Sequence, residues 1–466
     1  MHPLLLEALR ERQASGKPAR VALIGAGRFG TTVAAQLGQM PALRLSVVCD
    51  LRVENARGAW EAYGGGGTAG RAFAERAIST HGRPADDLAS AVDDGRPIST
   101  DDLAAAVSAP VDVVVEATGL PEIAARSALG AIRARHHVVM VTVEADVLLG
   151  PLLKRYADAA GVVYTLADGD QPAVTKRLCD WAEALGYEIV AAGRGTRFYP
   201  TDAAGVPEEA FQRYGYSDDL VTRRRFNAQM YNSFRDGSKA QIEMCALANA
   251  TGLVPDRRGM HEPSVGVSTL ARRFALQADG GLLSQSGVVE LANCVGPDGQ
   301  DVPDGIASGV FVVLRTGNPV LAEDLPFYGL LGVNVASGNG GYAAFWRPFH
   351  LCGIETPFSI AEAALLGRPT AAPGARPVAD VIAVAKRDLR AGDVLDGSGG
   401  RNVRGVIDRA EVVRAGGYLP EGLAYRVPLR RDVGAGEPIT YAMVDLSADS
   451  LAVQLRRELD EGFPTP

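Results

Sequence analysis

A lysine stands among carboxylates in the middle of the chain, in the stretch NSFRDGSKAQIEM at residues 232–244. Only five of the 47 basic residues are lysines. At about 100° per residue, Asp236, Lys239 and Glu243 fall on one helical face. An ammonium group there stays charged and can donate a proton to a substrate oxygen as a hydride moves, whereas a guanidinium in effect cannot. This predicts Lys239 and Asp236 as catalytic residues, with Glu243 beside the substrate.

The alternative interpretation of this stretch is structural. A solvated i,i+4 pair of Lys239 and Glu243 is worth only about 0.3 kcal/mol and needs no substrate. Two features favour chemistry instead. An amine is used in a chain that otherwise prefers arginine, and Asn232 adds a polar group to a stretch suited to a core. We therefore expect Asn232 to contact the substrate.

Two arginines lie among small residues in the stretch GRGTR, as Arg194 and Arg197. Glycines on both sides of Arg194 let a guanidinium group approach an anion and bind it with forked hydrogen bonds. The pattern predicts that both arginines hold a carboxylate or a phosphate, with Arg194 close to the reaction. The alternative is a pair of surface arginines that flank a turn.

Further polar candidates lie at the ends of predicted elements. Asp170 belongs to a turn before a helix, where it can cap the helix or face a catalytic site. His350 follows a predicted buried strand and is either a substrate ligand or a satisfied core residue. The sequence has no HExxH motif and no His/Cys cluster, so we predict no metal ligands. Whether a divalent ion assists stays open.

The N-terminal region has the pattern of a dinucleotide site. An apolar strand at residues 20–24 leads into GAGRFG at 25–30, then a helix, then a strand at 43–49 that ends at Asp50. The first glycine permits a tight turn, the second lets a pyrophosphate approach, and the third lets helix and strand pack. The helix N-terminus adds free N–H groups for the phosphates. The predicted cofactor contacts are Gly25, Gly27, Arg28, Phe29, Gly30 and Asp50.

Asp50 bears on the choice of cofactor. A carboxylate at this strand end accepts hydrogen bonds from the ribose hydroxyls and repels a 2′-phosphate, which favours NAD. Arg52 is close enough in sequence to reverse that preference, so NADP remains an alternative. A glycine-rich turn in an α/β domain without a nucleotide is the structural alternative.

Apolar runs at residues 111–115 and 137–141 alternate with helices, which describes a parallel sheet covered on both faces. Ligands bind such sheets at the carboxyl ends of the strands, so Thr118, Gly119 and Glu144 are expected near the nicotinamide. Glu144 has an alternative role as an acid at a helix N-terminus. The less regular residues 58–108 are interpreted as an insertion, either a lid or a surface excursion.

Bulk properties exclude several classes of protein. The chain has 466 residues, 47% of them hydrophobic, which suffices for two or three cores. The net charge of −8 and the lack of a basic stripe argue against nucleic acid as a partner. Five scattered cysteines fit reduced thiols, and no run approaches the length of a membrane span. We expect a cytoplasmic protein.

The C-terminal region contains an internal repeat. KRDLRAGD at residues 386–393 is similar to RRDVGAGE at 430–437, which predicts a small β module with two related turns. The Pro/Ala/Gly/Arg-rich residues 368–376 are a plausible linker before it.

The motifs GAGRFG, VVEATG, GDQP, AAGRGTRF, NSFRDGSKAQIEMCALANATGL, WRPFHLCGIE and AKRDLRAGDVLDGSGG together resemble the deoxyxylulose-phosphate reductoisomerase-like family. Its members are relatives of homoserine dehydrogenase with a C-terminal SAF domain. The resemblance covers most of the chain except residues 58–108. It implies NAD(P)-dependent redox chemistry, either reductive isomerisation of a sugar phosphate or oxidative isomerisation of a sugar acid, and a homodimer. It also matches Lys239 and Asp236 to the acid–lysine pair of the catalytic helix.

The predicted fold is thus α/β, with a doubly wound Rossmann domain at 1–165, including the 58–108 insertion. A homoserine-dehydrogenase-like α+β catalytic and dimerisation domain is expected at 166–367, its end returning to the Rossmann sheet, and a β-rich SAF domain at 378–466. The predicted function is an NAD(P)-dependent oxidoreductase, an oxidoisomerase or reductoisomerase, acting on a small anionic polyol or hydroxy-keto compound. The alternatives are a non-catalytic dinucleotide sensor and homoserine dehydrogenase.

Overall fold

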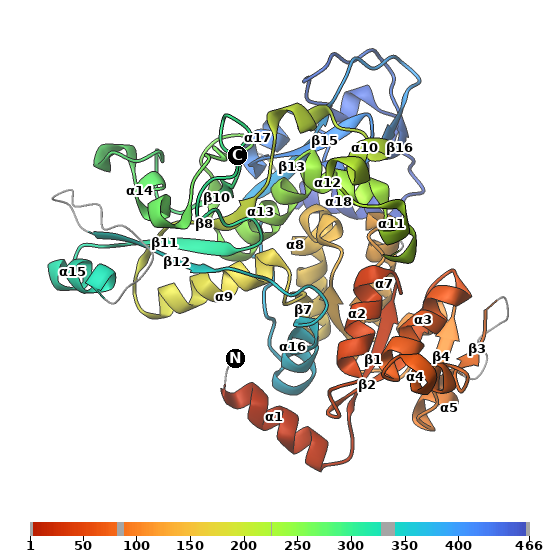
Figure 1. The fold of residues 1–466 in the computed structure, drawn as a ribbon. Coiled ribbons are helices and arrows are strands. Elements are labelled where there is room, and N and C mark those ends of the chain that lie inside the picture. The colour runs from red at the N-terminus through yellow and green to blue at the C-terminus, as the bar shows by residue number, and fades with distance from the viewer. Residues whose placement is uncertain (1–2, 82–87, 225, 328–340, 463–466) are drawn as a thin grey trace. The chain divides into compact units, whose positions relative to one another are not determined.

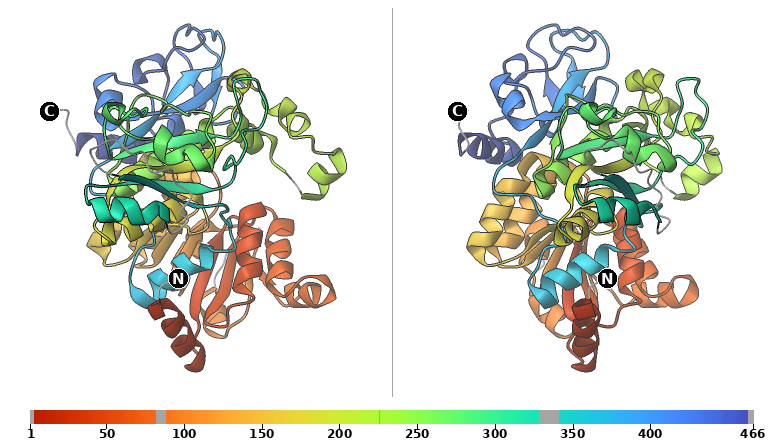
Figure 2. Two further views of the ribbon diagram at one scale, coloured as in Figure 1. Left: turned by 60° about the vertical axis from the view of Figure 1, so that its left-hand side comes forward. Right: turned by 90° about the vertical axis from the view of Figure 1, so that its left-hand side faces the viewer.

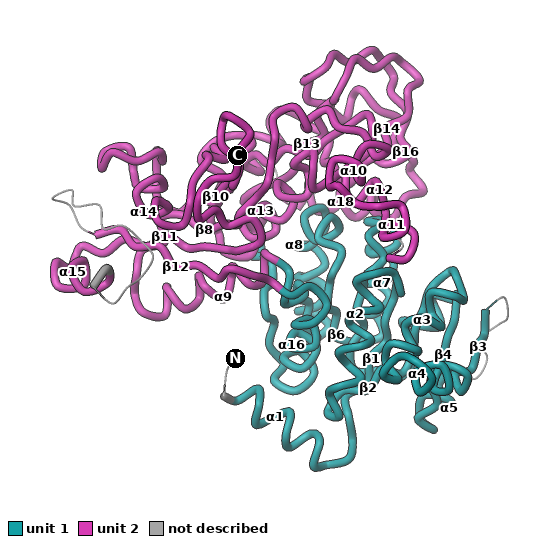
Figure 3. The backbone as a smooth tube through the Cα atoms, viewed as in Figure 1, with its two compact units in different colours: residues 1–170, 351–375 teal, residues 171–350, 376–466 magenta. Residues whose placement is uncertain are grey.

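The computed structural model describes residues 3–81, 88–224, 226–327 and 341–462. The chain forms two compact units (Figure 3). Unit 1 comprises residues 1–170 and 351–375, and unit 2 comprises residues 171–350 and 376–466. Each unit is therefore built from two separate stretches of sequence.

Unit 1 is built on a seven-stranded parallel sheet with the order β3-β4-β2-β1-β5-β6-β7 (Figure 1). Its inner strands are short apolar runs that are buried on both faces, as parallel sheets require. This is the doubly wound Rossmann sheet that the sequence predicts. The strands are β1 (Ala19–Ile24), β2 (Leu43–Cys49), β3 (Ile78–Ser79), β4 (Ile98–Thr100), β5 (Val113–Glu116), β6 (His137–Met140) and β7 (Tyr164–Leu166).

Helices cover both faces of this sheet (Figure 2). One layer contains α2 against α3 and α16, and the other contains α7 against α6 and α8. The helices of unit 1 are α1 (Pro3–Ala14), α2 (Arg28–Leu37), α3 (Val53–Tyr63), α4 (Gly67–Ala74), α5 (Leu88–Asp93), α6 (Leu103–Ser108), α7 (Pro121–Arg133), α8 (Val143–Ala160) and α16 (Thr356–Ala361), which continues as a π-helical turn (Glu362–Leu366).

The segment 58–108, expected as an insertion, belongs to the Rossmann sheet. It supplies β4, which pairs in parallel with β2, and β3, which pairs in parallel with β4 at the sheet edge. The strands are only three and two residues long, and β3 is partly exposed. Their apolar signal is too short to stand out in the sequence, which explains why the segment looked irregular.

Residues 351–375 return to the Rossmann unit. The amide of Leu166 donates to the carbonyl of Ala371 at 2.7 Å, so the returning chain runs beside β7. Ile360 and Ala361 of α16 join the core that also contains β1 and α2. Of the expected linker at 368–376, residues 368–375 belong to this unit.

Unit 2 has a mixed five-stranded sheet of order β12-β11-β8-β10-β9. Strands β8, β10 and β9 run parallel, while β11 is antiparallel to both β8 and β12. Helix α13 packs against this sheet, against α9 and against strands β13 and β15. The strands are β8 (Glu188–Thr196), β9 (Val254–Pro255), β10 (Val288–Asn293), β11 (Val310–Thr316), β12 (Gly341–Arg347), β13 (Ala379–Ala385), β14 (Val394–Asp396), β15 (Val403–Arg409) and β16 (Tyr425–Pro428).

The helices of unit 2 are mostly short, apart from α9 and α13, which flank the sheet. They are α9 (Gln171–Ala184), α10 (Pro207–Arg213), α11 (Asp218–Arg224), α12 (Ala228–Arg235), α13 (Ser238–Thr251), α14 (Leu270–Arg273), α15 (Pro319–Phe327), α17 (Ala410–Ala415) and α18 (Leu451–Glu461). Single 3-10 turns lie at Pro200–Ala204, Val267–Thr269, Gln277–Asp279, Glu421–Leu423 and Tyr441–Met443. No helix within the described ranges has the length and apolar character to cross a bilayer.

The repeated C-terminal turns pair with each other. Leu389 and Val433 exchange both of their backbone hydrogen bonds. Asp388 accepts from the Ala435 amide at 2.9 Å, and the equivalent Asp432 accepts from the Ala391 amide at 2.9 Å. The internal repeat thus encodes two turns that cap each other. These residues group with 171–350 in unit 2, and an independent SAF domain at 378–466 stays a prediction.

Asp146 carries one of the buried carboxyl groups of unit 1. Asp146, in the first turn of α8, is fully buried and accepts a hydrogen bond from the Tyr164 hydroxyl at 2.9 Å. Burial raises the pKa of Asp146 to about 7, against a weaker opposing effect of the tyrosine bond. In the unfolded chain the same carboxyl titrates near its ordinary value of about 3.9.

We predict that Asp146 makes unit 1 less stable as the pH rises. The folded chain binds the Asp146 proton more tightly than the unfolded chain does, so protonation stabilises the fold. This stabilisation is complete below about pH 4 and is lost as the pH rises to about 7. The difference amounts to about 4 kcal/mol. Asp146→Asn keeps a hydrogen-bond partner for Tyr164 but cannot ionise. Its urea midpoint should therefore increase relative to that of the wild type as the pH rises from about 4 to about 7. Asp158→Asn, at an exposed position of the same helix, is the control. Parallel midpoints at all pH values would contradict the assignment.

Candidate functional site

The glycine turn of unit 1 has two glycines that the fold itself requires. Gly25 has a φ of +91°, and a Cβ there would lie 2.6 Å from the carbonyl oxygen of Ala117. A Cβ on Gly30 would lie 2.1 Å from the carbonyl oxygen of Gly25. These glycines let β1, α2 and the end of β5 approach one another, as the sequence predicts.

Gly27 is different, because nothing in the fold requires a glycine there. Its φ is −69°, and a Cβ would meet no atom of the described residues within 4 Å. Gly27 and Arg28 are exposed, and Phe29 is half-buried against the core. Gly27 is the N-cap of α2 and offers no side-chain acceptor to the first amides of that helix. Open space over bare backbone at a helix N-terminus fits the approach of a phosphate group.

Asp50 lies at the end of β2 beside this turn. One carboxylate oxygen accepts from the Ala26 amide at 2.9 Å. The other accepts from the Arg52 amide at 2.9 Å and from the Asn55 side chain at 3.1 Å. A carboxylate has about four acceptor positions, so the group can order the turn and still accept from a ribose hydroxyl.

Thr118 and Gly119 follow the carboxyl end of β5, and Glu144 lies in the first turn of α8, after β6. Their proximity to a nicotinamide stays a prediction. The Thr118 amide and hydroxyl both donate to the carboxyl group of Glu116, which is fully buried. The Gly119 amide donates to the Thr142 hydroxyl at 2.9 Å. Burial raises the pKa of Glu116, and the charge of half-buried Glu144 adds to this effect. Buried polar groups therefore lie at the carboxyl ends of β5 and β6.

Asp170 closes the first stretch of unit 1, directly before α9. It is a buried carboxylate, 8% exposed, with the thiol of Cys352 at 3.9 Å from Oδ1. Cys352 comes from the returning segment, so the motif LCGIE and the GDQP turn meet in space. The sequence alone does not indicate this contact.

In unit 2 Lys239 lies on a helix, as predicted. The prediction that Asp236 shares one helical face with Lys239 and Glu243 is wrong. Gly237 has a φ of +84° and separates α12 from α13. Asp236 is the C-cap of α12 and does not share the helical face of Lys239 and Glu243. Lys239 lies in the first turn of α13 and is half-buried.

The cation beside Asp236 is Lys386. Its ammonium nitrogen lies 2.5 Å from the Asp236 carboxylate and donates to the carbonyls of Gly205 at 3.0 Å and Gly400 at 2.6 Å. The lysine side chain is 1% exposed and the aspartate 0%. Burial raises the pKa of Asp236, and the charge of Lys386 opposes this. Asp236 is thus a structural partner of Lys386. The rarity of lysine, which singled out Lys239, also applied to Lys386 and could have indicated it.

Glu243 lies one helical turn after Lys239 and forms a buried ion pair with Arg194 of β8. The Arg194 Nε also donates to the carbonyl of Gly195 at 2.9 Å. Arg194 is 7% exposed, so the alternative of a surface arginine is wrong for it. A substrate anion at Arg194 would share the guanidinium group with Glu243.

The other expected substrate ligands have protein partners. Arg197 is exposed and pairs with Asp301 at 2.7 Å, which lowers the pKa of that carboxyl. The Asn232 amide donates to the carbonyls of Gly205 at 2.9 Å and Gly399 at 2.7 Å, so both of its N–H groups serve the fold. The Nδ1 of His350 lies 2.7 Å from the carbonyl oxygen of Ser308. Within the described ranges, no group of three His, Cys, Asp or Glu side chains could hold a metal ion.

Comparison with known families identifies the chemistry of the middle region. Residues 169–356 match the family described as "Oxidoreductase DRL, catalytic domain". The match covers the part of unit 2 that contains Arg194, Lys239 and Glu243. The predicted enzyme class is confirmed: the chain is an oxidoreductase. No curated protein matches the sequence.

Solved structures with some likeness are distant. A "probable dehydrogenase" from Thermotoga maritima is 12% identical over 75% of this chain and 90% of its own, with a TM-score of 0.35. The 1-deoxy-D-xylulose 5-phosphate reductoisomerase of Zymomonas mobilis is 16% identical over 48% and 57%, with a TM-score of 0.32. The WlbA dehydrogenase of Chromobacterium violaceum is 13% identical over 64% and 71%, with a TM-score of 0.33.

We predict that Lys386→Met strongly destabilises unit 2. It leaves Asp236 as a buried charge without its cation, and such a loss typically lowers the free energy of unfolding by about 3–5 kcal/mol. The surface pair of Lys154 and Asp158 gives the control, because Lys154→Met should change stability by no more than about 1 kcal/mol. In the double variant Asp236→Asn, Lys386→Met, part of the loss should return. Urea unfolding measures all three, and equal stability of Lys386→Met and wild type would show that the pair is not structural.

Proposed function

We propose that the protein is an NAD(P)-dependent oxidoreductase, of the oxidoisomerase or reductoisomerase kind, acting on a small anionic polyol or hydroxy-keto compound. The observation that carries this proposal is the glycine turn of unit 1, in which Gly27 is open and unconstrained at the N-terminus of α2. The oxidoreductase match of residues 169–356 supplies the reaction class. When bound, the nicotinamide would accept or return a hydride.

The residues of unit 1 fit the two polar ends of a dinucleotide. The first amides of α2 and the bare backbone of Gly27 would bind the pyrophosphate. Asp50 would accept from the ribose hydroxyls, and its negative charge favours NAD over NADP. Thr118, Gly119 and Glu144 are the groups that we expect nearest to the nicotinamide.

Lys239 is the proposed electrophilic group. It is half-buried at the start of α13, and the buried pair of Glu243 and Arg194 holds the next turn of that helix. A partly desolvated ammonium group would stabilise negative charge on the substrate oxygen as the hydride moves. It would do so both when a hydroxyl becomes a carbonyl and in the reverse reaction. Glu243 then acts through Arg194 as a positioning residue, and Asp236 has no direct part.

The substrate is proposed to carry several hydroxyl groups beside one anionic group. Arg194 has only part of its charge available, because Glu243 already pairs with it. Arg197 is exposed, and its contact with Asp301 is exchangeable. A substrate carboxylate or phosphate could replace Asp301 at Arg197. The isomerase activity, the homodimer and the cytoplasmic location stay predictions from sequence.

We predict that Gly27→Ala weakens cofactor binding and leaves the fold intact. The new Cβ meets no protein atom within 4 Å but occupies the space through which a pyrophosphate would approach. The Kd for NAD(H) or NADP(H), followed by nicotinamide fluorescence, should rise at least about tenfold, which is about 1.4 kcal/mol. Gly58→Ala in α3, also without a neighbour within 4 Å, is the matched control. An unchanged Kd in Gly27→Ala would remove the basis of the proposed cofactor site.

We predict that Lys239→Met lowers kcat by roughly 10²–10³-fold, in keeping with the loss of a group that stabilises transition-state charge. The Kd for the cofactor should stay within about twofold, since the glycine turn belongs to unit 1. Lys176→Met is the control, because Lys176 pairs with Asp180 on the surface of α9. Absorbance of the reduced nicotinamide over a panel of sugar acids and sugar phosphates gives the rates. Equal loss of cofactor affinity and turnover would argue against the role.

A further inference from the structure

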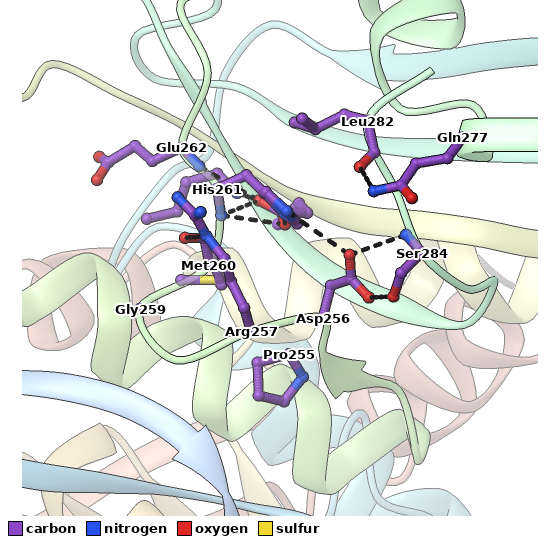
Figure 4. A network of polar contacts seen from close by, with 12 residues as sticks. Pro255, Asp256, Arg257, Gly259, Met260, His261, Glu262, Gln277, Leu282 and Ser284 are labelled. Carbon is purple, nitrogen blue, oxygen red and sulfur yellow. Dashed lines mark hydrogen bonds and ion pairs between the residues drawn. The ribbon is translucent and has the colours of Figure 1, made fainter. Parts of the chain in front are cut away.

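The loop that follows β9 is fixed by an unusual polar network around His261 (Figure 4). The His261 Nδ1 lies 2.6 Å from the carboxylate of Glu290, a fully buried residue of β10. The same carboxylate accepts from the backbone amides of His261 at 3.1 Å and of Glu262 at 3.4 Å. One buried group therefore holds two consecutive residues of the loop.

A second carboxylate lies on the other side of the imidazole ring. The Nε2 of His261 is 3.7 Å from Asp256, whose side chain is 2% exposed. The Ser284 amide donates to Asp256 at 3.0 Å, and the Ser284 hydroxyl donates to its other oxygen. His261 is thus clamped between two carboxylates that are themselves anchored.

This network holds the loop in a strained shape. Met260 has a φ of +64° and Glu262 a φ of +47°, a region that costs residues other than glycine about 1 kcal/mol each. Strain of this kind persists only where surrounding contacts determine it. The result is that the Glu262 side chain points away from His261 and Asp256, out of the network (Figure 4).

Glu262 gains no compensating hydrogen bond at Oε1. That oxygen is shielded from solvent and has no hydrogen-bond partner among the residues that the structure describes. Burial, together with the charge of Glu290, raises the pKa of Glu262 to about 8. The charges of Arg404 and Arg194 and a bond from the Thr196 hydroxyl oppose this rise. The carboxyl group is therefore protonated at neutral pH and ionises just above it.

The position of Glu262 links it to the proposed catalytic helix. Its backbone amide donates to Glu290, which lies beside Gly193 where β10 pairs with β8. The next residue of β8, Arg194, pairs with Glu243 one turn beyond Lys239. All of these groups belong to unit 2. A strained carboxyl group with one shielded oxygen that no described residue satisfies serves no evident structural purpose, and such groups are typical of catalytic sites.

We propose that Glu262 is a catalytic acid–base residue of this enzyme, which exchanges a proton with the substrate oxygen at which redox chemistry occurs. This inference rests on the proposed function. In oxidation, the hydroxyl proton passes to the Glu262 carboxylate, and the O–H bonding pair becomes the second bond of the carbonyl. The hydride leaves the carbon with its electron pair for the oxidised nicotinamide. Reduction reverses each transfer. Lys239 then supplies a fixed charge, and Glu262 supplies the mobile proton.

The decisive variant is Glu262→Gln, which keeps the size of the side chain and its neutral state but cannot exchange a proton. We expect kcat to fall by roughly 10²-fold, the lower range for general acid–base catalysis. In the wild type, the rate of oxidation should rise and the rate of reduction should fall as the pH increases through about 8. In the variant, neither rate should change over this pH range. Cofactor Kd and melting temperature should match those of the control Glu411→Gln, an exposed residue of α17.

A readout that does not depend on turnover is the titration of the carboxyl group itself. In the full chain labelled with ¹³C at glutamate Cδ, one resonance should titrate near pH 8 and be missing from Glu262→Gln. Wild-type turnover combined with an unchanged pH profile in the variant, or no such resonance, would overturn the inference and leave the proposed function standing. A wild type that transfers no hydride to any member of the panel would instead overturn the proposed function, and the inference with it.

Discussion

The buried ion pair between Arg194 and Glu243 is the contact on which the second unit depends. It joins the central strand β8 to helix α13, and both side chains are almost fully shielded from solvent. Removing one partner of such a pair leaves a buried charge, which typically costs about 3–5 kcal/mol. The pair also fixes a charge balance. The charges of Glu290 and Arg194 shift the pKa of Glu262 in opposite directions, and Arg194 is already paired with Glu243.

The C-terminal stretch of unit 2 completes α13. The Ser238 hydroxyl accepts from the Gly405 amide at 2.9 Å, and the Gln241 side chain accepts from the Ile407 amide at 3.0 Å. The Asn249 side chain accepts from the Val378 amide at 2.9 Å. A helix with polar residues on most sides is therefore almost wholly buried, because strands β13 and β15 use those residues as partners. This explains why the polar groups around Lys239 resembled a substrate site: many of them bind backbone instead.

The fold of unit 1 was largely predictable, because its strands are apolar runs and its glycine turn is local in sequence. Strands β3 and β4 were missed because two or three residues carry too little hydrophobic pattern. In unit 2 the helical period placed Lys239 and Glu243 correctly and failed only at Asp236, where the positive φ of Gly237 breaks the helix. Pairings between distant residues, such as Asp236 with Lys386, leave no periodic signal, so only tertiary structure reveals them.

The functional residues that we propose are positions that the fold does not explain. Gly25 and Gly30 are required by backbone contacts, so they say little about a ligand, whereas Gly27 has open space and an ordinary φ. Glu262 is the opposite case, since the fold would be relieved by another residue there: its backbone is strained and one of its oxygens is unsatisfied. The fold does not need the glycine at position 27, and it disfavours the glutamate at position 262. Each residue is better explained by a ligand or substrate that it contacts. A bound phosphate and an exchanged proton are causes of the right chemical kind.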